Sequence, residues 1–188
     1  MAPESIMSTV GKLCSRPNSL DFASMADLYQ LFEGLFLGTG GVLESLCGHT
    51  VLIFDHHFFH LAAVTRGAER LFMVNEKAEI IRTVEGLGLY TLGQQGSRAR
   101  HLPSAKVSIL DPDEVWEDNP KATNAKWVYV KGFDSAPYPY TVSLLTSRSE
   151  QNGIIVPVSS FPCRKAEVRK WRQGTLIYPK QKQPPLDG

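Results

Sequence analysis

The spacing of apolar residues predicts helices in the first half of the chain. In DFASMADLYQLFEGLF, residues 21–36, apolar side chains recur every three or four positions, which is typical of a helix with one buried stripe. Asp21 is its candidate N-cap, and the glycines of GTGG would end it. VLESLCG, residues 42–48, is predicted as a shorter helix. EKAEIIRTVEGLG, residues 76–88, predicts a second long helix, whose inward-facing residues are expected to be Ala78, Ile81 and either Val84 or Leu87.

Strands are predicted where β-branched and aromatic residues gather in short runs. TVLIF, residues 50–54, is one such run. Three more follow in the second half of the chain: AKWVYVKGF at 125–133, YPYTVSLLTS at 138–147 and NGIIVPVSSF at 152–161. Short turn sequences separate these three, so we expect them to pair as an antiparallel meander. The predicted fold class is α+β, with N-terminal helices packed on an antiparallel β-sheet meander.

The chain divides into four parts on these patterns. We predict a loose N-terminal arm at 1–20, a helical segment at 21–48, an α+β domain at 49–180 and a flexible tail at 181–188. Within the domain, the glycine-rich stretch 86–104 is predicted to be a mobile loop with a cationic tip. The acidic segment ILDPDEVWED is expected to cap a short turn or helix.

Composition narrows the class of protein. With 188 residues, 43% of them apolar and 21% charged, the chain is expected to form one soluble core. Its apolar runs fall short of the roughly 18 to 20 residues that cross a bilayer, and its first residues do not resemble a secretory signal. We therefore expect a cytoplasmic protein without a membrane partner. The wide spacing of Cys14, Cys47 and Cys163 favours reduced thiols.

Positive charge is concentrated near the C-terminus. Residues 1–120 contain 9 Lys or Arg against 15 Asp or Glu, whereas residues 121–188 contain 11 against 4. The segment CRKAEVRKWRQG surrounds one aromatic residue with cations, a pattern typical of a surface that faces a polyanion, although a solvated helix face would look the same. The candidate RNA-binding residues are Lys165, Arg169, Lys170, Trp171 and Arg172, with Arg98 and Arg100 from the predicted loop.

Three histidines stand within the apolar segment FDHHFFHLAAV, residues 54–64. His56 and His60 have the i, i+4 spacing of two zinc ligands on a helix, but His57 occupies the position of the glutamate in the metalloprotease signature, and a third ligand is not evident. Proton transfer is a second use, because an imidazole titrates near neutral pH and apolar neighbours favour its neutral form. Packing in the core is a third.

A second candidate motif is VPVSSFPCRK. Its predicted strand carries Ser159 and Ser160 and is followed at once by Arg164 and Lys165, so hydroxyl and cationic donors stand close enough in the chain to bind a phosphate. Strand-end serines followed by surface cations in a turn are the structural alternative. A glycine-rich phosphate loop, a dinucleotide fingerprint and a GxSxG motif are all missing, which disfavours nucleotide hydrolysis and acyl transfer.

The order of these motifs, FFHLAAV, ILDPDEVWED, KWVYVK, YTVSLL and IIVPVSSFP, resembles the phage-associated members of the barnase, EndoU, colicin and RelE-like ribonuclease superfamily over about residues 50–180. The resemblance implies helices packed on an antiparallel sheet. It carries over to His60, to the turn at Asp111–Asp113 and to Ser159 or Ser160, and it departs at Ala63, where a glycine is expected.

The function implied by the resemblance is metal-independent cleavage of RNA, with tRNA as one candidate substrate. In that reaction the ribose 2′-OH attacks its own phosphate, so the protein must move protons and stabilise negative charge on phosphorus. The residues expected to do so are His60 with His57 or His56, Ser159 or Ser160, and Lys131 with Arg164 or Lys165. No cofactor is expected; RNA is the expected partner, and a protein inhibitor or antitoxin would be a second.

Two other functions stay open at this point. A phage or mobile-element accessory factor could use the same basic segment to bind nucleic acid or protein without cleaving it. A histidine-ligated metal hydrolase is the other alternative, in which Asp55 and either His101 or His49 would complete the ligand set. The sequence does not decide which histidine is the base and which the acid.

Overall fold

The computed structural model describes residues 14–63, 77–88, 97–148 and 154–179. Its helices are α1 (Met25–Phe32) continued by a π-helical turn (Glu33–Leu37), α2 (His57–Leu61), α3 (Lys77–Glu85), α4 (Ser97–Arg100), α5 (Leu102–Leu110) and α6 (Lys165–Val168) with a 3-10 turn (Arg169–Trp171). Its strands are β1 (Val42–Glu44), β2 (Thr50–Leu52), β3 (Glu114–Glu117), β4 (Trp127–Gly132), β5 (Tyr140–Ser147), β6 (Ile155–Cys163) and β7 (Thr175–Tyr178).

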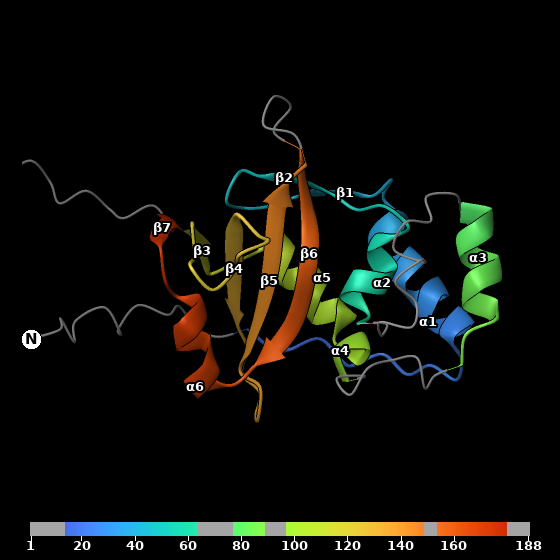
Figure 1. Ribbon diagram of the computed structural model, residues 1–188. Helices are drawn as coiled ribbons and strands as arrows, with labels where there is room; N and C mark the ends of the chain where they lie inside the picture. Colours follow the sequence, from blue (N-terminus) through green and yellow to red (C-terminus); the bar gives the residue numbers. More distant parts are fainter. Residues whose placement is uncertain (1–13, 64–76, 89–96, 149–153, 180–188) are drawn as a thin grey trace, which may run out of the picture.

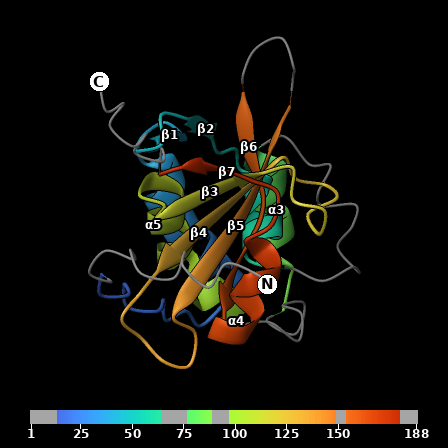
Figure 2. The same cartoon turned by 90° about the vertical axis from the view of Figure 1, so that its left-hand side faces the viewer.

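These strands form one sheet in the order β1-β2-β6-β5-β4-β3-β7. The predicted meander is confirmed as its centre, because β4 pairs antiparallel with β5 and β5 pairs antiparallel with β6. β2 joins β6 in parallel at Val51 and Ile155, so the sheet is mixed. Helices α1 to α5 lie on one side of the sheet and α6 on the other (Figures 1 and 2). The predicted α+β class is confirmed.

The two faces of the sheet bury different side chains. On the face toward α1 to α5, Tyr129 and Leu145 pack with the phenylalanines of α1 and α2. On the face toward α6, a smaller core of Val128, Val142 and Val168 forms. Burial of each large apolar side chain contributes about 1.5 to 3 kcal/mol. Because residues 25–36 share the first core with the sheet, the helical segment is part of the same folding unit.

Some predicted elements are confirmed and others are wrong. Helix α1 forms, but its N-cap is Ser24, whose hydroxyl accepts the Asp27 N–H at 3.0 Å, and not Asp21. The segment 42–48 is strand β1 and a turn, because it pairs with β2 and only one side of it is buried. In α3 the buried residues are Ile80 and Val84, while Ala78 is exposed.

The stretch from 86 to 118 differs most from expectation. Its residues 89–96 lie outside the described residues, but α4 and α5 replace the predicted loop at 97–104, and β3 replaces the predicted acidic turn. Ala99 and Leu102 are buried, which explains why helices form there. Among the described residues, no helix is long and apolar enough to cross a membrane.

The described end of the predicted N-terminal arm is bonded to the sheet. Cys14 bridges to Phe133 in parallel, and the Arg16 guanidinium donates to Ser135 Oγ at 2.9 Å and to Thr141 Oγ1 at 3.0 Å. The same guanidinium lies over the Phe133 ring at 4.3 Å. Residues 14–16 therefore close one end of the sheet and do not form a loose arm. The tail at 181–188 lies outside the described residues.

Candidate active site along strand β6

The two serines of strand β6 point to opposite faces of the sheet. Ser159 pairs with Leu144 and Pro157 pairs with Leu145, so Val158 is an extra residue, a β-bulge. Ser160 is 3% exposed and its hydroxyl bonds to Ser143 Oγ at 2.8 Å, within the core side. Only Ser159 reaches the face that carries α6, so the structure separates the two serines that the sequence left as equivalent.

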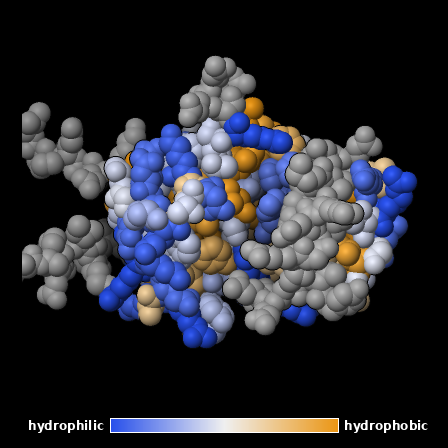
Figure 3. Space-filling view, viewed as in Figure 1, coloured by the Kyte–Doolittle hydropathy of each residue, from blue (hydrophilic) through white to orange (hydrophobic). Residues whose placement is uncertain are grey.

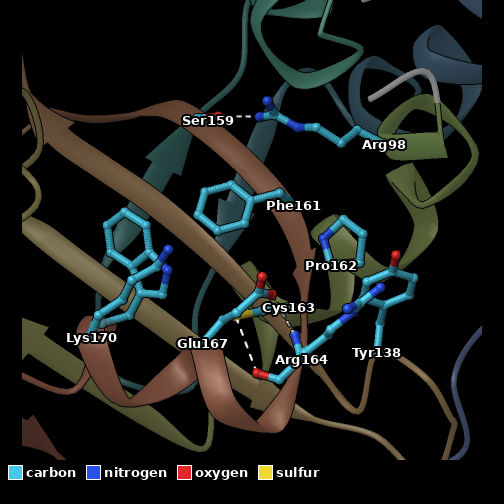
Figure 4. Close-up of a pocket in the computed structure, with 10 residues that line it drawn as sticks. Arg98, Tyr138, Ser159, Phe161, Pro162, Cys163, Arg164, Glu167 and Lys170 are labelled. Atoms are coloured by element: carbon cyan, nitrogen blue, oxygen red, sulfur yellow. Dashed lines mark hydrogen bonds between the residues drawn. The ribbon is translucent and has the colours of Figure 1, made fainter. Parts of the chain in front are cut away.

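Arg98 of α4 is fixed against this part of β6. Its Nε donates to the Ser160 carbonyl at 3.0 Å, its Nη2 donates to Ser159 Oγ, and its guanidinium lies over the Phe161 ring at 5.4 Å (Figure 4). Burial lowers the pKa of Arg98, but a guanidinium keeps its charge at neutral pH. The result is a cation held in one place on the α6 side of the strand.

A pocket of about 550 Å³ opens beside Arg98 and extends under α6. Three cations line it, Arg98, Arg164 and Lys170, against one carboxylate, Glu167. Glu167 accepts the backbone N–H of Arg164 at 3.1 Å and thereby caps α6. The remaining lining consists mainly of Ser159, the rings of Tyr138, Phe161 and Trp171, Pro162 and Cys163.

Aromatic rings support the cations of this pocket. Arg164 lies over Tyr138 at 5.5 Å and Lys170 over Trp171 at 5.6 Å, while Phe161 and Trp171 pack at 5.3 Å between ring centroids. In Figure 3, hydrophilic surface around α6 borders more apolar surface over the central strands. Positive charge beside flat apolar rings is the combination that binds the phosphates and unstacked bases of single-stranded nucleic acid.

The histidine segment lies against the same strand. Because β2 and β6 run in the same direction from Val51 and Ile155, the chain leaving β2 continues beside the later residues of β6, where α2 packs (Figure 1). Residues His57–Leu61 of this segment form helix α2, with His56 at the N-cap position. The helix packs on the strand that carries Ser159 from the side of the sheet opposite α6, and none of its histidines lines the pocket.

The three imidazoles differ in their environment. His57 is 4% exposed, and its Nδ1 accepts the Phe54 N–H at 2.9 Å. Burial, followed by the charges of His56, His60 and Arg148, lowers the pKa of His57 to about 3. His56 and His60 are half-buried, and burial is the main cause that lowers the pKa of each. At neutral pH all three are uncharged, and the two half-buried ones can meet a ligand.

Lys131 lies on the opposite face of the sheet from the pocket. Its side chain is 7% exposed, and its Nζ donates to Asp111 Oδ2 at 2.8 Å and to Asp113 Oδ1 at 2.9 Å. Burial by itself would lower the pKa of Lys131, but the bonds to the two aspartates outweigh it and raise the pKa. The lysine thus anchors the Asp111–Asp113 turn, and the structure does not bring it to the phosphate position expected from the sequence.

The other predicted cations divide into two groups. Arg172 binds Glu114 with two bonds of 2.8 Å, and Arg100 pairs with Asp21 at 3.0 Å, so both stabilise the fold. Lys165 and Arg169 are exposed on the α6 segment next to the pocket. Tyr138, Phe161 and Glu167 were missed by sequence reasoning. Phe161 carried a usable signal, because alternation along a strand places it on the same face as Ser159.

Other possible metal ligands are held elsewhere. His49 bonds through Nδ1 to the Tyr129 hydroxyl and packs on Trp127 at 5.3 Å, and Asp55 accepts from the Tyr29 hydroxyl at 2.5 Å. Within the described ranges, no three His, Cys, Asp or Glu side chains are grouped in a way that would hold a metal ion. The metal-hydrolase alternative therefore has no ligand set among those residues.

Comparison with protein families gives a match. The family model described as phage-Barnase-EndoU-ColicinE5/D-RelE like nuclease2 matches residues 43–179. This range contains every residue that lines the pocket and all of α2, while α1 lies outside it. Neither the curated proteins nor the solved structures include a significant match.

Proposed function

The chain belongs to this family of phage-Barnase-EndoU-ColicinE5/D-RelE-like nucleases, and from that premise we propose that it is a metal-independent endoribonuclease whose active site lies along strand β6. The observation that carries the proposal is the cationic, aromatic-lined pocket at Ser159, on the strand against which the histidine helix packs. RNA is the proposed substrate because its 2′-OH supplies the nucleophile, so that no bound metal is needed to activate water.

The proposed reaction is an internal transfer at phosphorus. The 2′-oxygen forms a bond to the phosphorus as its proton leaves, and the bond to the 5′-oxygen breaks as that oxygen receives a proton. The products are a 2′,3′-cyclic phosphate and a free 5′-hydroxyl. The protein must therefore provide one base, one acid and positive charge for the crowded phosphate.

His60 is the proposed base. Its lowered pKa leaves the imidazole neutral at pH 7, as a base must be, and it is half-buried, so substrate can reach it. His56 lies one helical turn away on the same side of α2 and is the proposed acid that returns the proton. It is uncharged in the free protein, so it has to take up a proton when the substrate phosphate binds beside it, because a nearby anion raises the pKa of an imidazole. His57 is removed from this role, because its Nδ1 is bonded to the backbone and its ring is buried.

Arg98, Arg164 and Lys170 are proposed to bind the phosphates. Of these three cations, Arg98 is held in place by hydrogen bonds to strand β6, and Ser159 orients it through the bond to Nη2. Positive charge that is already in place when the reaction begins needs no reorganisation, so it stabilises the transition state efficiently. Lys131 and Ser160 leave the proposed site, because the lysine is bonded to two aspartates and the Ser160 hydroxyl is buried against Ser143.

A synthetic oligoribonucleotide tests the proposal, with total tRNA as a second substrate. We expect cleavage in EDTA, products ending in a cyclic phosphate, and no cleavage at a position that carries a single 2′-deoxy sugar. His60→Ala should lower kcat/KM at least a hundredfold while the protein still unfolds cooperatively. His49→Gln, in which the changed histidine bonds to Tyr129, is the matched control and should keep most activity.

Other outcomes would select the alternatives. Activity that disappears with EDTA and returns with a divalent metal would support the metal hydrolase. Binding of RNA without any cleavage would support the accessory factor. Full activity of His60→Ala would remove this histidine from the mechanism and leave the family assignment untouched.

A further inference from the structure

An exposed aromatic and cationic surface lies where the chain leaves strand β2 and approaches α2, beside the end of strand β5. Phe54 is 38% exposed, one of few large apolar side chains on the described surface. His56 stacks on its ring with a centroid distance of 5.8 Å and an angle of 7° between the planes, and the guanidinium of Arg148 lies over it at 5.8 Å. We refer to Phe54 and Arg148 together as the Phe54 platform.

The platform adjoins the proposed catalytic histidines. Arg148 ends strand β5, and its N–H donates to the Ile154 carbonyl at 3.0 Å, next to the start of β6. Its charge acts on both His56 and His57, which places the guanidinium close to α2. The platform is therefore next to His56, the proposed acid.

Packing explains only part of this arrangement. A phenylalanine that is 38% exposed loses more than a third of the stabilisation that full burial would provide, and an exposed cation–π contact contributes only about 0.5 to 1 kcal/mol. A flat ring backed by an imidazole and flanked by a guanidinium does suit an unpaired nucleobase with its adjacent phosphate. Stacking on such a ring contributes about 1 to 3 kcal/mol per base.

We propose that the Phe54 platform is a second nucleotide-binding subsite, which stacks an unpaired base of the RNA strand on the opposite side of the scissile phosphate from the α6 pocket. The inference rests on the proposed function. It gives the substrate class as single-stranded RNA that spans both subsites, because a base inside a duplex cannot stack on a protein ring.

The pocket and the platform are separate sites, because neither Phe54 nor Arg148 lines the pocket. A dinucleotide has a single phosphodiester, so it has no further phosphates and bases with which to occupy both sites while that bond is cleaved. We therefore expect kcat/KM to rise with substrate length from a dinucleotide to a decanucleotide.

The test compares these two substrates in EDTA. In Phe54→Ala and in Arg148→Gln, the ratio of kcat/KM for the decanucleotide to that for the dinucleotide should fall about tenfold. Leu46→Ala, which removes an apolar side chain 68% exposed at the turn of the β1–β2 hairpin, is the control for Phe54 and should keep the wild-type ratio. Lys121→Gln, an exposed cation in the β3–β4 connection, is the control for Arg148.

Binding of an uncleavable decanucleotide with 2′-O-methyl sugars separates the two proposals. Phe54→Ala should raise its Kd about tenfold, and Arg148→Gln should reduce the slope of log Kd against log salt by about one unit. If wild type binds this ligand but does not cleave RNA, the ribonuclease proposal fails while the subsite stands. An unchanged ratio together with an unchanged Kd in both variants would overturn the subsite, as would an equal loss on both substrates.

Discussion

Replacement of Lys131 by methionine is expected to destabilise the fold and to leave the chemistry unchanged. Methionine keeps the length of the aliphatic stem and removes the charge, so the packing around residue 131 is retained. What is lost are the bonds of Nζ to Asp111 at 2.8 Å and to Asp113 at 2.9 Å. Asp113 keeps one partner, since its Oδ2 accepts the Gly132 N–H at 2.7 Å.

The expected loss follows from the exposure of the three side chains. Lys131 is 7% exposed, whereas Asp111 is 50% and Asp113 is 33% exposed. Removal of one partner from a fully buried ion pair costs about 3 to 5 kcal/mol, and a surface pair contributes about 0.2 to 1 kcal/mol. Because water can still reach both aspartates, we expect a loss of about 2 kcal/mol, or a Tm lower by about 4 to 8 °C.

Urea unfolding at pH 7 measures this loss. The raised pKa of Lys131 means that its contribution is complete below the ordinary lysine pKa of about 10.4 and disappears as the pH rises above the folded value. The difference between variant and wild type should thus be constant from pH 7 to 9. Lys126→Met is the matched control: its pair with Glu117 at 3.5 Å is exposed, so its removal should change stability by less than about 1 kcal/mol.

RNA cleavage by the folded variant decides the role of this lysine. We expect kcat/KM within about threefold of wild type at a temperature where both are folded, a difference of less than about 0.7 kcal/mol. A loss of more than a hundredfold in cleavage without a loss of stability would show that Lys131 acts at the phosphate, and would refute the reasoning from its ion pairs.

Three further predictions test other parts of the structure. Ser159→Ala should lower kcat/KM about tenfold by releasing Arg98. Ser160→Ala should lower the free energy of unfolding by about 1 kcal/mol and keep its activity. A loss of activity in Ser160→Ala with full activity in Ser159→Ala would show that Ser160 is the serine at the site. The pKa of His57 is lowered to about 3, so the free energy of unfolding should be at its full value above pH 6.5 and fall by up to about 1.4 kcal/mol per pH unit below it. His57→Asn, which retains an acceptor for the Phe54 N–H, should make this fall less steep in urea titrations. An equal slope in variant and wild type would show that His57 is not the group responsible. Ala63 has a positive φ of 57°, so Ala63→Gly should raise the unfolding free energy by about 1 kcal/mol, and a lower Tm would show that the methyl group contributes more than the strain it causes.

The central strands and the histidine cluster were accessible from local patterns. β-Branched runs separated by turns identified β4, β5 and β6, since alternating burial leaves a period of two in the sequence. The segment 42–48 was misjudged because β1 has only three residues, too few for a period to distinguish a strand from a helix. Helices α4 and α5 were missed because the glycines before them suggested a longer loop.

The sequence by itself determined the α+β class, the order of the central strands and the presence of imidazoles, serines and cations along the chain, because these depend on residue type and local period. The tertiary structure decided which of them meet. A bulge at Val158 turns Ser159 toward the pocket and leaves Ser160 in the core. Arg98 bonds to Ser159, which is 61 residues further along the chain. Lys131 forms ion pairs with two aspartates and is therefore not available at the pocket. Strand register and long-range pairing set these contacts, and neither leaves a periodic signal in the sequence.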